Sequence, residues 1–183
     1  MIYLLRHGQT DWNVQRKIQG HTNLALNENG RRQALALSSE MDKFQFDVIL
    51  TSDLIRAKET ADILNKHTQI KVFTDTRLRE INLGSLEGQP IQYLTSEVWA
   101  ELSKDDNCYQ AETLKRTYDR VKDFFEQLNF EQNVLIVTHS GLLKVMAYYR
   151  FYPDEFDYGK FAEKFKDLWI PNTQIISWNT LGQ

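Results

Sequence analysis

The chain has 183 residues, of which 42% are hydrophobic and 26% charged, a composition that indicates one globular domain spanning residues 1–183. The net charge is −3 and no run of lysines or arginines is present, so we expect no nucleic-acid partner. Cys108 is the single cysteine, which excludes an internal disulfide and fits a reducing cytosol. The opening MIYLLRHG becomes charged too soon for a signal peptide, and no apolar run approaches bilayer length. We therefore expect a cytoplasmic protein with no membrane partner.

Apolar runs alternate with helical patterns, which is typical of an α/β fold with a mainly parallel sheet. The runs that predict strands lie at residues 2–5, 48–50 and 134–137, with weaker ones near 70–73 and, at the sheet edge, 174–178. Helices are expected after Asn27, after Ser52 and over residues 142–149, with Asn27 and Ser52 placed as N-caps. In the first of these helices the predicted core-facing residues are Ala34, Leu37 and Met41.

The segment from about residue 86 to residue 128 has polar, helical patterning and no apolar run that would form a buried strand. We expect it to form a helical cover over one end of the sheet. Its clearest helix is predicted over residues 113–128, where apolar side chains recur at helical spacing. Aromatic residues of this cover, such as Trp99, are expected to pack in the core or in a lid.

Charged and polar residues follow three of the predicted strands. Arg6 and His7 end the first strand, Ser52 and Arg56 follow the second, and His139 follows the strand at residues 134–137. Ligands of open α/β sheets bind outside the carboxyl ends of the strands. The sequence therefore predicts that these residues share one rim of the sheet.

That rim has the chemistry of a phosphate site. The guanidinium groups of Arg6 and Arg56 match phosphate oxygens in bidentate geometry. Helices beginning near Ser52 and Gly141 would add free N–H donors. Together these groups would bind a phosphoryl group and stabilise its charge during transfer.

Three further side chains could carry the transfer itself. A neutral His7 can attack phosphorus and form a phosphohistidine, while a protonated His139 would stabilise the equatorial oxygens. Glu80, in the loop after the third strand, is the candidate acid for the leaving oxygen. The orientation of Arg79 relative to this carboxylate, and contact of His21 with substrate, are left open by the sequence.

Five blocks occur along the chain: LLRHGQTDWN at 4–13, IQGHTNLALNENGRRQA at 18–34, LTSDLIRAKETA at 50–61, RLREINLGSLEG at 77–88 and IVTHSG at 136–141. In content, order and spacing they resemble the histidine phosphatase superfamily, the phosphoglycerate-mutase-like proteins. This resemblance implies a three-layer α/β/α fold with a mostly parallel central sheet and one antiparallel edge strand. It also implies a reaction that needs no metal and no dissociable cofactor.

The resemblance assigns roles to positions of this chain. His7 matches the phosphorylated histidine, and Glu80 matches the proton donor. The residues implied to bind the substrate phosphate are Arg6, Asn13, Gln19, Arg56, His139 and Ser140. The catalytic set expected on both grounds is His7, Glu80, Arg6, Arg56 and His139.

The block around Glu80 and the short cover resemble the small phosphatase branch of the family. We therefore expect a metal-independent phosphomonoester hydrolase that acts on a small phosphorylated metabolite. Many members of that branch carry Gly-Glu-Ser before the long helix, whereas this chain has Ala111, Glu112 and Thr113 there, which leaves the fine specificity open.

Two other functions remain to be weighed, a cofactor-dependent phosphoglycerate mutase and a non-catalytic phosphate-binding protein. A cysteine-based phosphatase needs an arginine six positions after its cysteine. In this chain the residue six positions after Cys108 is Leu114, so this class is not expected. His7 and His139 also lack the companion spacing of a metal site. The oligomeric state is open, and a homodimer is allowed.

Overall fold

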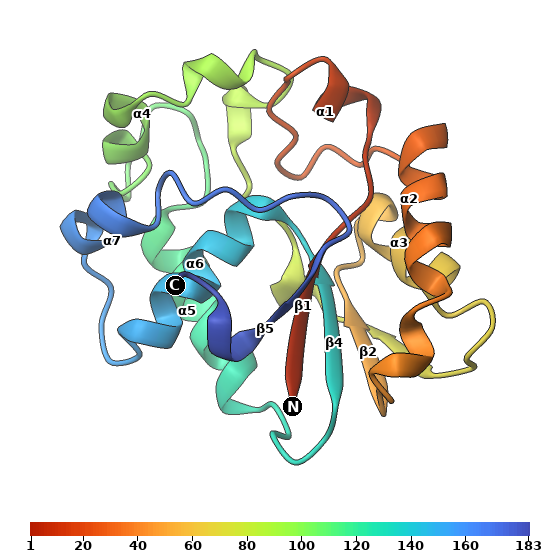
Figure 1. The fold of residues 1–183 in the computed structure, drawn as a ribbon. Coiled ribbons are helices and arrows are strands. Elements are labelled where there is room, and N and C mark those ends of the chain that lie inside the picture. Colours follow the sequence, from red (N-terminus) through yellow and green to blue (C-terminus); the bar gives the residue numbers. More distant parts are fainter.

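The computed structural model describes residues 1–183 and shows an α/β fold built on one five-stranded sheet (Figure 1). In spatial order the strands are β3 (Lys71–Thr74), β2 (Val48–Thr51), β4 (Val134–Thr138), β1 (Ile2–Arg6) and β5 (Ile175–Ser177). All neighbouring pairs are parallel except at one edge, where β5 runs antiparallel to β1. The predicted mostly parallel sheet with one antiparallel edge strand is confirmed.

Helices cover both faces of the sheet. α2 (Glu28–Ser38) and α3 (Ile55–Leu64) lie on one face, and α5 (Leu114–Glu126) and α6 (Ser140–Phe151) lie on the other (Figure 1). Successive strand side chains point to opposite faces, so Leu4 packs in the core beneath α5 and α6 while Leu5 packs in the core beneath α3. The three-layer α/β/α prediction is confirmed.

The remaining helices are short: α1 (Asp11–Val14), α4 (Ser96–Glu101) and α7 (Tyr158–Lys164). Figure 1 shows α1 and α4 beyond the carboxyl ends of the strands. The predicted cover at 86–128 therefore lies only partly over the end of the sheet, because α5 packs beside α6 on a face. No helix of the structure is long and apolar enough to cross a bilayer. The assignment of residues 1–183 to one domain stays a prediction.

One of the two predicted N-caps is confirmed and one is wrong. The side chain of Asn27 accepts a hydrogen bond from Gly30 N–H at 2.8 Å and begins α2. The N-cap of α3 is Leu54 rather than Ser52, whose Oγ accepts only from Leu54 N–H within the preceding turn. The first N–H of α3, on Ile55, donates instead to Asn23 Oδ1 at 2.8 Å. A loop distant in sequence has taken the capping role, which local sequence does not reveal.

One of the three predicted core residues of the first helix lies beyond the end of that helix. α2 ends at Ser38, so Met41 lies in a separate 3-10 turn, although it is still buried. Ala34 is buried within α2 as expected, and Leu37 is partly buried.

The register of the sheet aligns the ends of its central strands. Arg6 is opposite Thr138 across β1 and β4, and the N–H of His7 donates to the Thr138 carbonyl at 2.9 Å. His7 directly follows β1 and His139 directly follows β4. The two histidines therefore lie side by side at the edge of the sheet. The predicted rim exists because parallel neighbours end at the same edge.

Candidate active site

His7 is buried directly after β1, with 2% of its surface exposed. Its Nδ1 lies 2.7 Å from the Gly8 carbonyl oxygen, a geometry in which Nδ1–H donates and Nε2 keeps its lone pair. Burial, followed by the charges of Arg56 and Arg6, lowers the pKa of His7 well below 6.5. The imidazole is therefore neutral at neutral pH, which is the form that can attack phosphorus.

Arg56 of α3 is completely buried beside this lone pair. Its Nε–H donates to His7 Nε2 at 3.2 Å, and its two terminal nitrogens donate to the carbonyls of Thr22 (2.9 Å) and Gly20 (2.7 Å). Burial lowers the pKa of Arg56 to about 10, so the group is still charged at neutral pH. A buried cation bound to neutral partners alone favours an anionic ligand.

The buried side-chain nitrogens without a hydrogen-bond partner are Arg6 Nε, His139 Nδ1 and His139 Nε2. An unsatisfied buried polar atom costs about 1–3 kcal/mol, so such atoms mark a place where a ligand would supply the partner. The His139 ring centroid lies 5.2 Å from that of His7, and Arg6 Nη1 donates to Ile170 O at 2.7 Å. Phosphoryl oxygens beside His7 would accept from Arg6 Nε–H and from a ring N–H of His139.

The protonation state of His139 differs from the expectation. Burial, followed by the charge of Arg56, holds the pKa of His139 well below 6.5, so the ligand-free ring is neutral at neutral pH. The expected imidazolium would need a nearby negative charge. A bound phosphate dianion would supply that charge and raise the pKa of His139.

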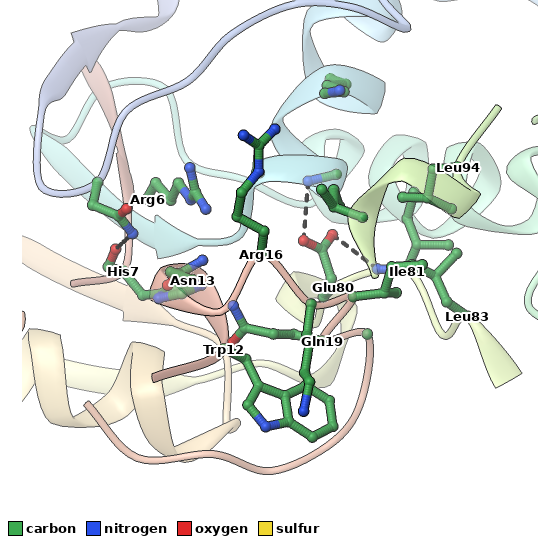
Figure 2. Close-up of a pocket in the computed structure, with 18 of the residues that line it drawn as sticks. Arg6, His7, Trp12, Asn13, Arg16, Gln19, Glu80, Ile81, Leu83 and Leu94 are labelled. Atoms are coloured by element: carbon green, nitrogen blue, oxygen red, sulfur yellow. Dashed lines mark hydrogen bonds between the residues drawn. The ribbon is translucent and has the colours of Figure 1, made fainter. Parts of the chain in front are cut away.

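Glu80 reaches the same cavity from the loop after β3. Its Oε1 accepts from the N–H groups of Ile81 (3.0 Å) and Leu142 (2.9 Å), and its Oε2 accepts from Gly141 N–H at 3.0 Å. Two of these bonds are drawn in Figure 2. The carboxylate thus lies at the N-terminus of α6, where the helix dipole favours negative charge. Arg79 is directed away and pairs with Asp53.

These contacts correct the predicted role of the helix N-termini. Glu80 takes the N–H groups of Gly141 and Leu142 at the start of α6, and Asn23 takes that of Ile55 in α3. Protein acceptors already satisfy these three N–H groups, so the expectation that they are free to bind phosphate is wrong. Binding of phosphate by Ser140, at the same helix end, stays a prediction. Side-chain cations remain as the main source of positive charge at the site.

Thr10 orients the two predicted amide ligands. Its Oγ1 lies 3.1 Å from Asn13 Oδ1 and 3.0 Å from Gln19 Oε1, and its N–H donates to Asn13 Oδ1 at 2.9 Å. Because both amide oxygens are held at Thr10, the NH₂ groups of Asn13 and Gln19 are left to donate elsewhere. Both side chains line the cavity (Figure 2).

The structure gathers the predicted residues around one cavity of about 720 Å³. Seven of the eight line its wall: Arg6, His7, Asn13, Gln19, Arg56, Glu80 and Ser140. The eighth, His139, is fully buried beside His7 and is not part of the wall. No group of three His, Cys, Asp or Glu side chains in the structure is placed to hold a metal ion. The catalytic and phosphate-binding roles, and metal independence, stay predictions.

Sequence reasoning missed Glu87, which holds the loop at residues 20–24. Its carboxylate accepts from the N–H groups of His21 (2.8 Å), Thr22 (2.8 Å) and Leu83 (3.1 Å), and from the Thr22 hydroxyl (2.6 Å). Glu87 lies within the block at 77–88, so the signal was present although its role was not recognised.

Three more supporting residues come from distant segments. Arg120 of α5 and the ring of His21 both bind the Glu80 carbonyl, at 3.0 and 2.8 Å. Asn172 donates to the His7 carbonyl at 2.6 Å. His21 therefore supports the Glu80 loop and is not part of the cavity wall. Nothing in the local sequence marks Asn172.

The family model for the histidine phosphatase superfamily (branch 1) matches residues 2–167, a range that contains every predicted site residue. This chain belongs to the histidine phosphatase superfamily. The family predicted from the five blocks is thus confirmed.

Similar members of this superfamily carry both phosphatase and mutase names. The uncharacterized phosphatase PhoE of Bacillus subtilis (strain 168) is 35% identical over 149 residues, which are 79% of this chain and 74% of the relative. Phosphoglycerate mutase-like protein 4 of Arabidopsis thaliana is 34% identical over 155 residues, 78% and 67% of the two chains. A solved mycobacterial glucosyl-3-phosphoglycerate phosphatase, complexed with VO3, matches with a TM-score of 0.79 at 26% identity, over 95% of this chain and 88% of its own.

This superfamily member has Ala111, Glu112 and Thr113 before its long helix, where many members of the small phosphatase branch have Gly-Glu-Ser. The structure explains how these residues serve the helix and the site. Thr113 is the N-cap of α5 and accepts from Arg116 N–H at 3.1 Å, as a serine hydroxyl could. Glu112 pairs with Arg120, which in turn binds the Glu80 carbonyl. The Ala111, Glu112, Thr113 sequence therefore keeps the cap and the ion pair beneath Glu80.

Proposed function

We propose that this histidine phosphatase superfamily member hydrolyses phosphate monoesters of small metabolites through a phosphohistidine on His7. The observation that carries the proposal is the neutral Nε2 of His7 among buried donors of Arg6, Arg56 and His139. The phosphatase names of similar proteins support it. A metal-independent reaction in the cytoplasm is part of the same proposal, and the oligomeric state stays open.

The proposed reaction has two displacements. In the first, the lone pair of His7 Nε2 forms a bond to phosphorus while the ester P–O bond breaks, and protonated Glu80 gives its proton to the leaving oxygen. In the second, water attacks the phosphohistidine, the Glu80 carboxylate takes a proton from that water, and the P–N bond breaks. Free phosphate and neutral His7 result. Arg6 and Arg56 stabilise the charge on the phosphoryl oxygens in both steps.

The test is hydrolysis of p-nitrophenyl phosphate in the presence of EDTA by the wild type and by His7→Ala. We expect the wild type to remain active and His7→Ala to lose about a thousandfold or more in kcat, since the nucleophile is removed. His67→Ala is the matched control, because His67 is exposed and distant from the cavity. Full activity in His7→Ala would overturn the assignment of the nucleophile.

A phosphoglycerate mutase is the second candidate, favoured by the names of several relatives. It would use the same His7 site but return the phosphoryl group to the bound intermediate. An assay of 3-phosphoglycerate primed with 2,3-bisphosphoglycerate separates the two functions. Rapid interconversion without release of phosphate would favour the mutase, and release of phosphate would favour the phosphatase. If a broad panel of esters is inert while phosphate binds, the chain is a phosphate-binding protein.

A further inference from the structure

The loop that carries Glu80 is held from α5 by one arginine. The Arg120 guanidinium donates to three carbonyls of this loop, with Nη1 bound to those of Arg77 (2.6 Å) and Arg79 (2.9 Å) and Nη2 to that of Glu80 (3.0 Å). A single side chain of the helix therefore fixes the backbone of residues 77–80, including the residue that supplies the proposed acid.

Glu112 sets the orientation of this guanidinium. Its Oε1 accepts from Arg120 Nε–H at 2.6 Å and its Oε2 accepts from Nη2 at 3.0 Å, a bidentate pair in which the Arg120 and Glu112 side chains are 18% and 16% exposed. Together with the three loop carbonyls, these contacts occupy all five N–H groups of Arg120. The Glu112 N–H also donates to the Asn82 carbonyl at 2.8 Å. The ion pair thus has one orientation and is joined to the loop at both of its residues.

The ring of His21 holds the same carbonyl from another segment. Its Nε2 lies 2.8 Å from the Glu80 carbonyl oxygen, and because a carbonyl can only accept, this nitrogen carries the hydrogen. The Glu80 carbonyl therefore accepts from both His21 and Arg120. None of His21, Glu112 and Arg120 lines the active-site cavity. Any effect of these residues on the reaction must pass through Glu80.

The Glu80 carboxylate is bound to the neighbouring helix. The N–H groups of Gly141 and Leu142 in α6 donate to it at 3.0 and 2.9 Å. The backbone of Glu80 is thus fixed by α5 and its side chain by α6, two helices that pack against each other. A general acid must lie within hydrogen-bond reach of the leaving oxygen, and a misplacement of about 1 Å can cost roughly 100-fold in rate.

We propose that Arg120, oriented by Glu112, is a positioning residue for proton transfer by Glu80. The proposal rests on the proposed function, in which Glu80 protonates the leaving oxygen, and it adds a residue outside the cavity on which that step depends. Its consequence is specific. Loss of Arg120 should slow the reaction in proportion to how much the leaving group needs a proton.

The experiment compares p-nitrophenyl phosphate with 2-phenylethyl phosphate. The p-nitrophenolate anion is a weak base that leaves without a proton, whereas an alkoxide is a strong base that needs one. We measure kcat/KM, because it reports the transfer to His7 and not the later hydrolysis of the phosphohistidine. Arg120→Met should lower it about 10- to 100-fold on the alkyl ester and about threefold or less on p-nitrophenyl phosphate. Glu112→Gln, which keeps the shape of the side chain, should show the same selective loss at about tenfold.

Arg77→Met is the matched control. Arg77 also joins this loop to α5, through an ion pair with Asp123 at 2.7 Å, but its side chain does not bind Glu80. It should change the two esters by the same small factor. Equal losses on both esters in Arg120→Met and Glu112→Gln would overturn the proposal and leave the pair a purely structural role. If Arg120→Met fails to fold, the ratio in Glu112→Gln decides.

Hydrogen exchange tests the same contact without turnover. The N–H groups of Gly141 and Leu142, which the Glu80 carboxylate accepts, should exchange faster in Arg120→Met and at the wild-type rate in Arg77→Met. Unchanged exchange in Arg120→Met would overturn the positioning role. If the wild type hydrolyses neither ester, the proposed function fails, and the exchange rates alone show whether Arg120 holds the Glu80 carboxylate in place.

Discussion

At the level of single residues, the hydrogen-bond and ion-pair partners of each side chain determine which groups of the site are free to bind a ligand. His7 is neutral because burial, followed by the charges of Arg56 and Arg6, lowers its pKa, and the Gly8 carbonyl that accepts from Nδ1–H leaves the lone pair on Nε2. Arg6 and His139 keep unsatisfied nitrogens. Arg79, in contrast, is paired with Asp53.

Thr10 should be a positioning residue for phosphate binding. Thr10→Val keeps the shape but removes the hydroxyl that lies between the amide oxygens of Asn13 and Gln19, and Gln19 Oε1 loses its donor. We therefore expect kcat/KM on p-nitrophenyl phosphate to fall by roughly tenfold. It should also lower the free energy of unfolding by about 1 kcal/mol, since Thr10 caps α1.

The conservative variant separates positioning from stability. Two constants are measured for each variant: kcat/KM on p-nitrophenyl phosphate and the inhibition constant of inorganic phosphate. In Thr10→Ser both should be close to the wild-type values. If Thr10→Val changes the unfolding transition but leaves both constants unchanged, Thr10 has only a structural role.

At the level of elements, a loop held by the partly buried carboxylate of Glu87 positions Arg56. Glu87 binds the loop at residues 20–24, and this loop supplies the Gly20 and Thr22 carbonyls that hold Arg56. An added Cβ on Gly20 would lie 2.1 Å from Glu87 Oε1, so the loop and the carboxylate are in close contact. The placement of Arg56 therefore depends on a residue that never touches it.

Glu87→Ala should release that loop. We expect faster hydrogen exchange at His21 and Thr22 and a fall in kcat/KM of about tenfold or more, because Arg56 loses the backbone that orients it. Glu59→Ala is the control, since Glu59 also binds a backbone N–H, that of Leu26, but lies outside the cavity wall. Unchanged exchange in Glu87→Ala would rule out this coupling.

The cap of α5 gives a test of the departure from the branch pattern. Thr113→Ala should lower the free energy of unfolding by about 1 kcal/mol, because Arg116 N–H loses its acceptor. Thr113→Ser should be close to the wild type in denaturant titrations. A large loss in Thr113→Ser would mean that the threonine methyl group, and not the cap, matters here.

At the level of the whole molecule, two buried neutral histidines link stability to pH. Folding lowers the pKa of both His7 and His139, so below about pH 6.5 the unfolded chain binds protons that the folded chain does not. The free energy of unfolding should therefore be at its full value above pH 6.5 and decline as the pH falls, by up to about 1.4 kcal/mol per pH unit for each histidine.

Urea titrations between pH 7.5 and 5.5 would measure this decline. His139→Gln should reduce the slope because one of the two linked protons is removed, whereas Thr113→Ala should lower stability without changing the slope. A stability that rises as the pH falls over this range would contradict the assignment of neutral buried rings.

The sheet and its rim could be predicted from the sequence because their determinants are local. The run at 134–137 is buried on both faces, and parallel strands must end together, so Arg6, His7 and His139 had to share an edge. The Asn27 cap was equally readable, since an N-cap acts within three residues of itself.

The partners of the site residues were decided only by tertiary structure. Asn172 binds the carbonyl of His7 from 165 positions away, and Glu80 takes the N–H groups of α6 that were expected to meet phosphate. Burial likewise left His139 neutral. A local pattern specifies where a strand or helix begins, but the partner of a buried polar group depends on which distant segment packs beside it.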